Sequence, residues 1–324
     1  MQLTATQKTA IITAARAYAD LNKLSQNDLA ARADINAGYL STMLGGKTST
    51  KAGQKDVEIS DKWFIKLAEA VGYALVTTYW KPVLTVQFQE IMHTLVQSKE
   101  EGRMAMLIGD SGCGKTSTID LFMNKHPLHS YRLTVSSLYK LGDVVQELCE
   151  RVGVEVTTIR GSRMQSYSLK VRLDKIAEKL VDIKQAGGKP LIILDEGENF
   201  EMSTLKMIKA LYDKLDGYCP IVIVGTHQLL DKLLNLSKRN RYGIPQLYRR
   251  FKAGQKIISP INNDYKVMLE AFVEDAGLRA LITTLCDNYG EVHDYLEPAL
   301  RKAAEKGVPL TEEFFRVMYN LKKK

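Results

Sequence analysis

The sequence contains few of the residues that form covalent or metal cross-links. Its 324 residues include four cysteines and five histidines. The histidines show no metal-binding spacing, and the cysteines, none of them in a C-x-x-C pair, are scattered at Cys113, Cys149, Cys219 and Cys286. This pattern argues against a disulfide framework and against a zinc site, and it is typical of a reducing cytosol.

The sequence also lacks long apolar runs. No run approaches the length of about 18 residues that a membrane-spanning helix needs. Residues 1–6 lack the basic-then-apolar pattern of a secretion signal. Hydrophobic residues make up 45% of the chain, which is enough for a packed core in one large domain or in two to three smaller ones. We therefore expect a cytoplasmic protein without a membrane partner.

A glycine-rich loop is the most specific motif. Residues 109–116 read Gly-Asp-Ser-Gly-Cys-Gly-Lys-Thr and fit G-x-x-x-x-G-K-[ST], between an apolar run that predicts a buried strand and a segment with helical spacing. Backbone N–H groups of such a loop surround phosphates, and the helix N-terminus adds positive potential. We expect Lys115 to neutralise the β- and γ-phosphates of ATP and Thr116 to ligate Mg²⁺. The predicted nucleotide-binding residues are Gly109, Asp110, Ser111, Gly112, Cys113, Gly114, Lys115, Thr116 and Ser117.

Two adjacent carboxylates follow a second predicted strand. Residues 191–194 are four apolar residues in a row, which is typical of a strand covered on both faces in a parallel sheet. Asp195 and Glu196 come directly after them. At the carboxyl end of such a strand, Asp195 would hold Mg²⁺ through water and Glu196 would polarise the attacking water. Together with the glycine-rich loop, this pair predicts an ATPase core.

Basic residues gather in two clusters. The net charge is +8, and residues 232–256 contain eight Lys or Arg and no acidic residue. A second cluster comprises Arg160, Arg163, Lys170 and Arg172. Such clusters are usually solvated surface, but two of them beside an ATPase core favour a polyanionic partner, of which nucleic acid is the commonest.

The amino-terminal residues predict a separate helical module. Residues 6–21 have helical apolar spacing, Ser25 starts a second, short helix, and Asn36 caps a third. Residues 60–71 form another amphipathic helix after a polar insertion. Two short helices joined by a tight turn are typical of a helix-turn-helix. The module resembles the repressor-like fold of phage repressors, which implies DNA contacts from Asn36, Tyr39, Ser41 and Thr42. A bundle used for protein contacts stays open as an alternative, because the third helix has no Lys or Arg before Lys47.

The segments after the carboxylate pair resemble AAA+ ATPases. A predicted strand at residues 220–225 ends at Thr226, where that family senses the γ-phosphate, and helices fill residues 264–321 as a lid. Residues 246–251 resemble the segment that presents an arginine finger to a neighbouring subunit, which favours Arg250 over the adjacent Arg249. A plain basic turn is the alternative. The position of the family's second sensor arginine holds His293, a residue that is not always charged, so its role at the nucleotide stays open.

The order of these features resembles that of the MuB transposition proteins, which are related to the IstB and TnsC clade. The resemblance covers nearly the whole chain, including the 225–227 strand end, the 248–251 segment and the basic residues 160–172. It implies an α/β fold with an AAA+ P-loop core built on a parallel sheet, a helical lid, and an all-α helix-turn-helix domain in front. The implied domains are residues 1–72, a linker at 73–86, the core at 87–260 and the lid at 261–324.

The same resemblance implies a function. With ATP bound, such proteins form helical filaments on duplex DNA, deliver this target to a DDE-type transposase and stimulate it. An arginine finger that acts on a neighbouring subunit makes the contact between subunits head-to-tail. Such contacts yield a helix when the rotation from one subunit to the next does not close into a ring. The four basic residues Arg160, Arg163, Lys170 and Arg172 would contact phosphates with little sequence preference.

Three other functions share part of this pattern. A helicase loader would share the core, but we would not expect the repressor-like module. A nucleotide-gated transcription regulator would share the module and is expected to have a more basic recognition helix. A membrane-linked secretion ATPase should carry a transmembrane helix, which the sequence does not show.

Overall fold

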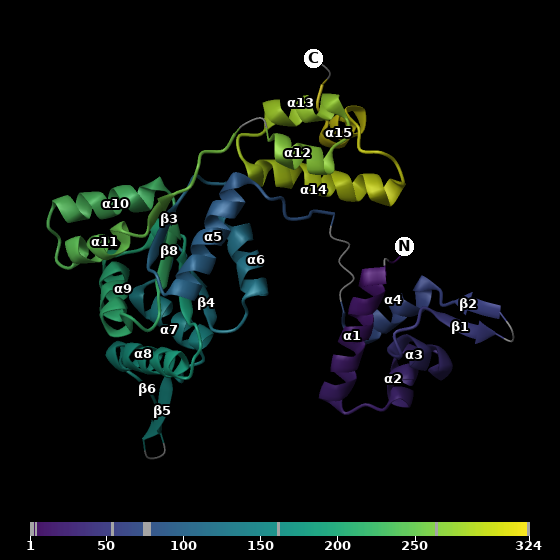
Figure 1. Ribbon diagram of the computed structural model, residues 1–324, viewed down its shortest axis with the longest axis horizontal. Coiled ribbons are helices and arrows are strands. Elements are labelled where there is room, and N and C mark those ends of the chain that lie inside the picture. The colour runs from purple at the N-terminus through teal and green to yellow at the C-terminus, as the bar shows by residue number, and fades with distance from the viewer. Residues whose placement is uncertain are drawn as a thin grey trace. The chain divides into compact units, whose positions relative to one another are not determined.

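The computed structural model describes residue 3 and residues 5–52, 55–73, 79–160, 163–262 and 265–322. The chain divides into two compact units, Met1–Tyr79 and Trp80–Lys324 (Figure 1). Among the described residues, none of the helices has the length and hydropathy needed to cross a membrane.

The described residues of the first unit include four helices: α1 (Ala5–Asn22), α2 (Gln26–Ala33), α3 (Ala37–Leu44) and α4 (Asp61–Ala70). They pack around a core that includes Leu29, Leu40 and Phe64, all fully buried. Helix α2 begins after Ser25, as the sequence predicts, and Ser25 and Asp28 make a reciprocal capping box there. Asn36 caps α3 by accepting a hydrogen bond from the Gly38 backbone N–H at 2.8 Å.

The polar insertion between α3 and α4 is a small β element. Strands β1 (Ser49–Ala52) and β2 (Lys55–Glu58) pair as an antiparallel hairpin. The first unit is therefore mainly helical but not all-α, which corrects the sequence prediction. Polar residues hide this hairpin in the sequence, because neither face shows the apolar alternation that predicts a half-buried strand.

A five-stranded parallel sheet forms the centre of the second unit. The strands are β3 (Ala105–Ile108), β4 (Ser130–Thr134), β7 (Leu191–Asp195), β8 (Ile221–Gly225) and β9 (Gln255–Ile257), in the order β4-β7-β8-β3-β9. The three central strands are buried along their whole length, which explains their continuous apolar sequences. Because all strands are parallel, their carboxyl ends meet at one edge of the sheet.

Helices cover both faces of this sheet (Figure 1). Helices α5 (Val86–Glu101) and α6 (Lys115–Lys125) pack on one face, against alternate residues such as Leu191 and Ile193. The other face, which includes Ile192 and Leu194, packs against five helices. These are α7 (Leu141–Val152), α8 (Leu169–Gln185), α9 (Met202–Leu215), α10 (His227–Lys238) and α11 (Ile244–Lys252).

A second hairpin leaves the body of the sheet. Strands β5 (Thr157–Arg160) and β6 (Arg163–Ser166) pair antiparallel, with Arg160 opposite Arg163. Figure 1 shows this hairpin projecting beyond α8. The predicted basic cluster therefore begins on an extended arm.

The last four helices form the lid: α12 (Lys266–Phe272), α13 (Ala276–Leu285), α14 (Tyr289–Lys306) and α15 (Glu312–Tyr319). They enclose a separate core that includes the fully buried Leu278, Leu296 and Phe315. Trp80 stacks on Phe272 with 4.1 Å between ring centroids. The carboxyl end of the segment predicted as a linker, residues 73–86, thus belongs to the packed second unit, while residues 74–78 lie outside the described residues.

The junction of β9 with β3 gives a stability prediction. A Cβ atom at Gly254 would clash with the backbone carbonyl oxygen of Met104. We expect Gly254→Ala to cost about 1–3 kcal/mol, as overpacking does, and to lower the thermal midpoint by about 2–4 °C for each kcal/mol. Gly142 in α7 has open space around it, so Gly142→Ala is the matched control and should leave the midpoint unchanged or raise it. Equal losses in the two variants would contradict the crowding at Gly254.

Candidate nucleotide-binding site

The glycine-rich loop joins β3 to α6 at the carboxyl edge of the sheet. Gly112 and Gly114 have φ values of 73° and 91°, which side chains with a Cβ rarely adopt. A Cβ atom at Gly109 would lie 3.1 Å from that of Ile258, so the backbone also passes close to its neighbours there. These glycines allow the loop to turn tightly into the helix. Cys113 is buried under the loop, while Asp110, Ser111, Thr116 and Ser117 are exposed.

Lys115 is the first residue of α6. Its ammonium group donates hydrogen bonds of 2.8 Å each to the backbone carbonyls of Gly109 and Asp110. The helix begins after Gly114 without a side-chain cap. The first-turn N–H groups of α6 therefore have no capping side chain, and together with the ammonium group they form a site of positive potential for an anion.

Asp195 ends β7, with 1% of its surface exposed. One carboxylate oxygen accepts a hydrogen bond from Arg132 Nη2 at 2.7 Å, and the other accepts one from the backbone N–H of Glu196 at 3.0 Å. Sequence reasoning missed Arg132, because a single arginine in an edge strand carries no signal. Both oxygens of the predicted metal ligand are thus oriented by neighbours.

Glu196 has a strained backbone. Its φ of 59° and ψ of 46° lie in the left-handed region, which costs a residue with a side chain about 1–3 kcal/mol. Burial raises the pKa of Glu196, the charges of Glu198 and Asp195 raise it further, and Lys115 and Arg132 oppose the shift. Backbone strain and raised carboxyl pKa values are common at functional sites, where a general base or a water-orienting residue is needed.

Thr226 follows β8 and lies between the loop and the carboxylates. Its hydroxyl oxygen is buried and has no hydrogen-bond partner in the described part of the chain. Its backbone N–H donates to Glu198 Oε2 at 3.2 Å. Glu198 belongs to the short 3-10 helix η1 (Gly197–Asn199), and the backbone of this helix accepts a hydrogen bond from Lys232 at 2.5 Å. The sequence does show Glu198 as a third carboxylate just after Asp195. It does not show that Glu198 binds the backbone of Thr226, which follows a different strand.

The first turn of α14 contacts the glycine-rich loop. The backbone N–H of Gly290 donates to the Gly112 carbonyl at 3.3 Å, and a Cβ atom at Gly112 would clash with the side-chain oxygen of Asn288. His293, the expected counterpart of a second sensor arginine, instead sets its ring edge-on to Trp80 at 4.9 Å. The lid therefore contacts the loop through Asn288, which sequence reasoning did not select, and through Gly290, which begins the segment matched to the second-sensor motif.

The two candidate finger residues in α11 differ in their surroundings. Arg250 pairs with Asp213 and lies over the Tyr212 ring, with 4.2 Å from its guanidinium carbon to the ring centroid. Both partners belong to α9 of the same chain. Arg249 is exposed. An arginine finger at position 250 must therefore leave an internal ion pair before it can reach another subunit.

The predicted DNA-contacting residues of the core also differ from one another. Arg160 and Arg163 lie next to the hairpin tip, although their side chains lie outside what the structure describes. Lys170 is exposed in the first turn of α8. Arg172 donates to the Tyr167 carbonyl at 3.0 Å and to the Gln146 side chain at 2.8 Å. The structure therefore gives Arg172 an internal role that the sequence pattern did not predict.

Part of the 232–256 basic run is also used internally. Lys232 binds the backbone of η1, Arg250 pairs with Asp213, and Lys256 pairs with Glu90 at 3.0 Å. The positive charge of this segment is therefore smaller at the surface than its sequence suggests.

In the first unit, the predicted DNA contacts lie on α3 and at its cap. Asn36 and Ser41 are exposed, and Thr42 is half-buried. Tyr39 packs beside Trp63 of α4 with 5.9 Å between ring centroids. The Lys62 and Lys66 ammonium groups lie 5.1 and 5.4 Å from the same Trp63 ring. Lys66 also pairs with Asp34 at 2.6 Å, so its charge is partly used within the unit.

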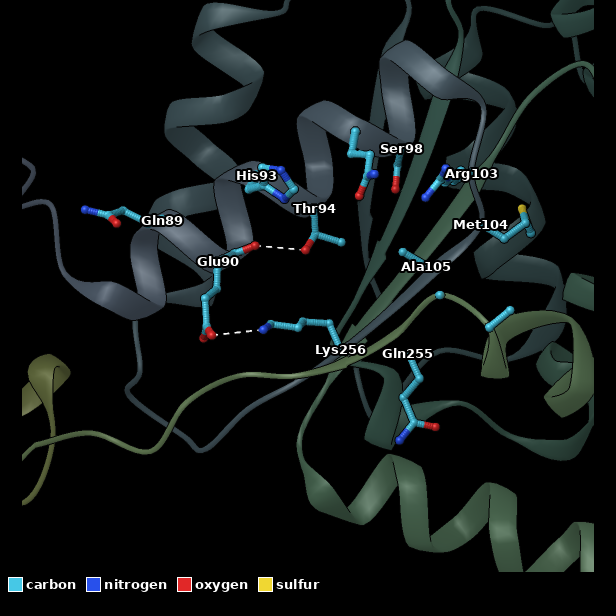
Figure 2. Close-up of a pocket in the computed structure, with 13 residues that line it drawn as sticks. Gln89, Glu90, His93, Thr94, Ser98, Arg103, Met104, Ala105, Gln255 and Lys256 are labelled. Carbon is cyan, nitrogen blue, oxygen red and sulfur yellow. Dashed lines mark hydrogen bonds and ion pairs between the residues drawn. The ribbon is translucent and has the colours of Figure 1, made fainter.

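A pocket of about 590 Å³ lies elsewhere, between α5 and β9 (Figure 2). Figure 2 shows Glu90 of α5 reaching Lys256 of β9 across it. Met104 and Ala105, at the start of β3, also line it. The glycine-rich loop leaves the opposite end of β3, so this pocket is separate from the candidate site.

The side chains present suit a magnesium ion held mainly by a nucleotide. Thr116 and Asp195 supply a hydroxyl and a buried carboxylate, whereas no cluster of three or more His, Cys, Asp or Glu side chains that could hold a metal occurs in the described ranges. Mg²⁺ is usually bound by one or two protein oxygens together with substrate phosphates and water. The orphaned Thr226 hydroxyl also fits an oxygen-rich ligand at this edge.

Comparisons with known proteins agree with this geometry. Residues 98–233 match the AAA domain family. No curated protein matches the sequence. The structure of the Aeropyrum pernix Orc1 protein in complex with DNA is similar, with a TM-score of 0.52, 15% identity, and coverage of 74% of this chain and 66% of that one. The Thermotoga maritima RuvB Holliday junction branch migration motor gives a TM-score of 0.41 at 12% identity, over 72% of this chain and 68% of that one. The second unit thus has the AAA+ P-loop fold, and residues 98–233 within it match the AAA domain family.

Proposed function

We propose that this protein is a magnesium-dependent ATPase that binds duplex DNA in its ATP-bound state and assembles on it as a helical oligomer. In this role it delivers target DNA to a DDE-type transposase and stimulates it. The observation that carries the ATPase proposal is the meeting of the glycine-rich loop, Asp195, Glu196 and Thr226 at one edge of the sheet. Each has the chemistry that one part of ATP hydrolysis requires.

The residues divide the work as follows. Backbone N–H groups of the loop and the Lys115 ammonium bind the β- and γ-phosphates. Thr116 and Asp195 hold Mg²⁺, which when bound neutralises negative charge on these phosphates. Glu196 orients and polarises the attacking water, and the Thr226 hydroxyl donates to the γ-phosphate. The contact of α14 with Gly112 couples lid position to the loop.

Assembly follows from an arginine that acts on another subunit's ATP. A contact in which one patch of a subunit meets a different patch of the next is head-to-tail, and it yields a helix when the rotation does not close. ATP at this interface links nucleotide state to assembly. Arg250 is the first candidate and the exposed Arg249 is the second.

DNA binding is proposed for the β5–β6 arm. Arg160, Arg163 and Lys170 supply cations near its tip and base, and phosphate contacts of this type give affinity with little sequence preference. Repeated along a helical oligomer, many weak contacts add up. Asn36, Tyr39, Ser41 and Thr42 in the first unit offer a second DNA-contacting surface, with Lys62 of α4 beside it.

The delivery of target DNA to a transposase rests on the resemblance to the MuB proteins. A helicase loader of the same fold remains the alternative for the core, and a nucleotide-gated transcription regulator is the alternative for the combination with the first unit. Electron microscopy of the protein with ATP and long duplex DNA separates these functions. Continuous helical filaments favour target delivery, whereas closed rings or isolated dimers on DNA favour the alternatives.

Glu196 gives a direct test of the chemistry. Glu196→Gln should bind ATP and Mg²⁺ normally and hydrolyse ATP about 10²–10⁴-fold more slowly, because the water loses its base. ATP-dependent DNA binding should persist longer than in the wild type. Lys115→Ala is the contrasting variant and should lose ATP binding itself, which calorimetry would show. Glu198→Gln is the matched control. Fast ATP hydrolysis by Glu196→Gln together with slow hydrolysis by Glu198→Gln would show that Glu198 is the base.

Arg250 gives a test of assembly. We expect Arg250→Ala to bind ATP almost normally but to hydrolyse it poorly and to form few filaments. Mixing it with Lys115→Ala should restore part of the hydrolysis, because some interfaces then combine an intact ATP site with an intact finger. Arg249→Ala, tested in the same way, decides between the two residues. A mixture as inactive as its components would show that Arg250 does not act in trans.

The basic arm gives a test of DNA binding. Replacing Arg160, Arg163 or Lys170 with Ala should weaken binding equally on unrelated duplexes and lower the salt slope by about one per lost contact. Arg172→Ala removes the same charge from the same segment, but Arg172 is held by Tyr167 and Gln146, so the slope should stay unchanged. A slope unchanged from that of the wild type in all four variants would place the DNA on another surface.

A further inference from the structure

Arg132 occupies a place at the nucleotide site that its sequence position does not suggest. It lies in the edge strand β4, whose parallel pairing sets Arg132 opposite Ile193 and Thr134 opposite Asp195. Because side chains alternate along paired strands, Arg132 projects from the same face as Ile193 and Asp195. This is the face that α5 and α6 cover.

The guanidinium group of Arg132 is held at two ends. One nitrogen donates to Asp195 at 2.7 Å, and another pairs with Asp120 of α6. The side chain of Arg132 is 17% exposed, and its Nε is buried without a hydrogen-bond partner among the described residues. The two carboxylates therefore fix the orientation of the guanidinium group. Because this group is planar and rigid, the position of one carboxylate constrains the position of the other.

Asp120 connects this pair to the phosphate loop. It lies four residues after Thr116, so the two residues share one face of α6, one turn apart. Arg132 therefore joins the buried Asp195 carboxylate at the end of β7 to Asp120, which lies one helix turn after Thr116 in α6. The two protein oxygens expected at the metal come from different elements, and Arg132 bridges those elements.

We propose that Arg132 is a positioning residue for the magnesium site, which fixes Asp195 relative to the Thr116 turn so that both meet the metal in one geometry. This inference rests on the proposed ATPase function and deepens it. Arg132 contacts neither nucleotide nor metal in this role. It acts through Asp195, in the way that outer-shell partners orient metal-binding carboxylates.

The charges around Asp195 are arranged for this role. The charges of Asp195 and Glu198 act together to raise the pKa of Glu196, and those of Lys115 and Arg132 oppose this shift. Asp195 therefore shares its surroundings with two other carboxylates, and Arg132 is the cation that pairs with it directly. Asp195 is almost fully buried, so its ion pair is only weakly screened by solvent. Asp120, with 61% of its side chain exposed, provides the outer anchor.

The test is the coupling between Mg²⁺ and ATP binding. ATP affinity is measured by calorimetry in excess EDTA and again with Mg²⁺, and the ratio of the two is the coupling factor. In Arg132→Ala we expect this factor to fall about tenfold or more, as for other outer-shell changes, while ATP affinity in EDTA stays near that of the wild type. The thermal midpoint should fall, because the buried Asp195 carboxylate loses its ion-pair partner. Asp120→Asn should give a smaller fall, because Asp195 keeps its partner. Arg151→Ala, which breaks an exposed pair on α7, is the charge-matched control and should change nothing.

The outcomes separate this inference from the proposed function. A wild-type protein that binds no ATP in either condition would refute the ATPase proposal itself. Normal ATP binding with an unchanged or larger coupling factor in Arg132→Ala would overturn the role of Arg132 alone. If Arg132→Ala fails to fold, Arg132→Lys serves instead: it keeps the charge but cannot bridge two carboxylates in a plane, so a wild-type coupling factor in that variant would also overturn the inference.

Discussion

The parallel pairing of β7, β8 and β3 is the constraint on which the candidate site depends. It brings the carboxyl ends of three strands to one edge, so that residues separated by more than 100 positions become neighbours in space, as where the Gly109 N–H donates to the Gly225 carbonyl at 3.1 Å. Strands buried on both faces cannot tilt or slip without exposing apolar side chains or moving polar ones inward. The apolar core thus holds the polar site in register.

Charge at this edge is balanced by side chains from several elements. The carboxylates come from β7 and η1, while the cations come from α6 and β4. A nucleotide and its metal ion bring both signs of charge, so a site with oriented carboxylates and an uncapped helix N-terminus can receive both. The left-handed backbone at Glu196 and the orphaned Thr226 hydroxyl lie at the same place, where local strain is balanced by the surrounding core.

The positive net charge has two different uses. Arg132, Arg172 and Lys232 bind carboxylates, amides or carbonyls within the chain, and so contribute to its own structure. Lys170 and Arg249 are exposed and remain available to partners. A count of basic residues cannot separate these groups, because an arginine in an ion pair and an arginine at the surface look alike in a sequence. Function assigned from charge alone would therefore be overstated.

The sequence by itself determined the features that depend on neighbouring residues. The glycine-rich loop, the apolar strands before Gly109 and Asp195, the caps at Ser25 and Asn36 and the lid helices all follow from short-range periodicity and from backbone requirements. Together with the AAA domain match, these patterns were enough to place the fold. The β1–β2 hairpin was missed because its polar strands lack the alternation that marks a strand.

Only the tertiary structure decided which distant side chains meet. Arg132 with Asp195, Glu198 with Thr226, Arg250 with Asp213 and Asn288 with the loop each join elements far apart in the chain. Each of these pairings depends on strand order, register and helix placement together, and a single residue carries no local record of them. Periodicity determines which face of a helix or strand is apolar. The packing of those faces determines which polar groups meet at the ends of the helices and strands.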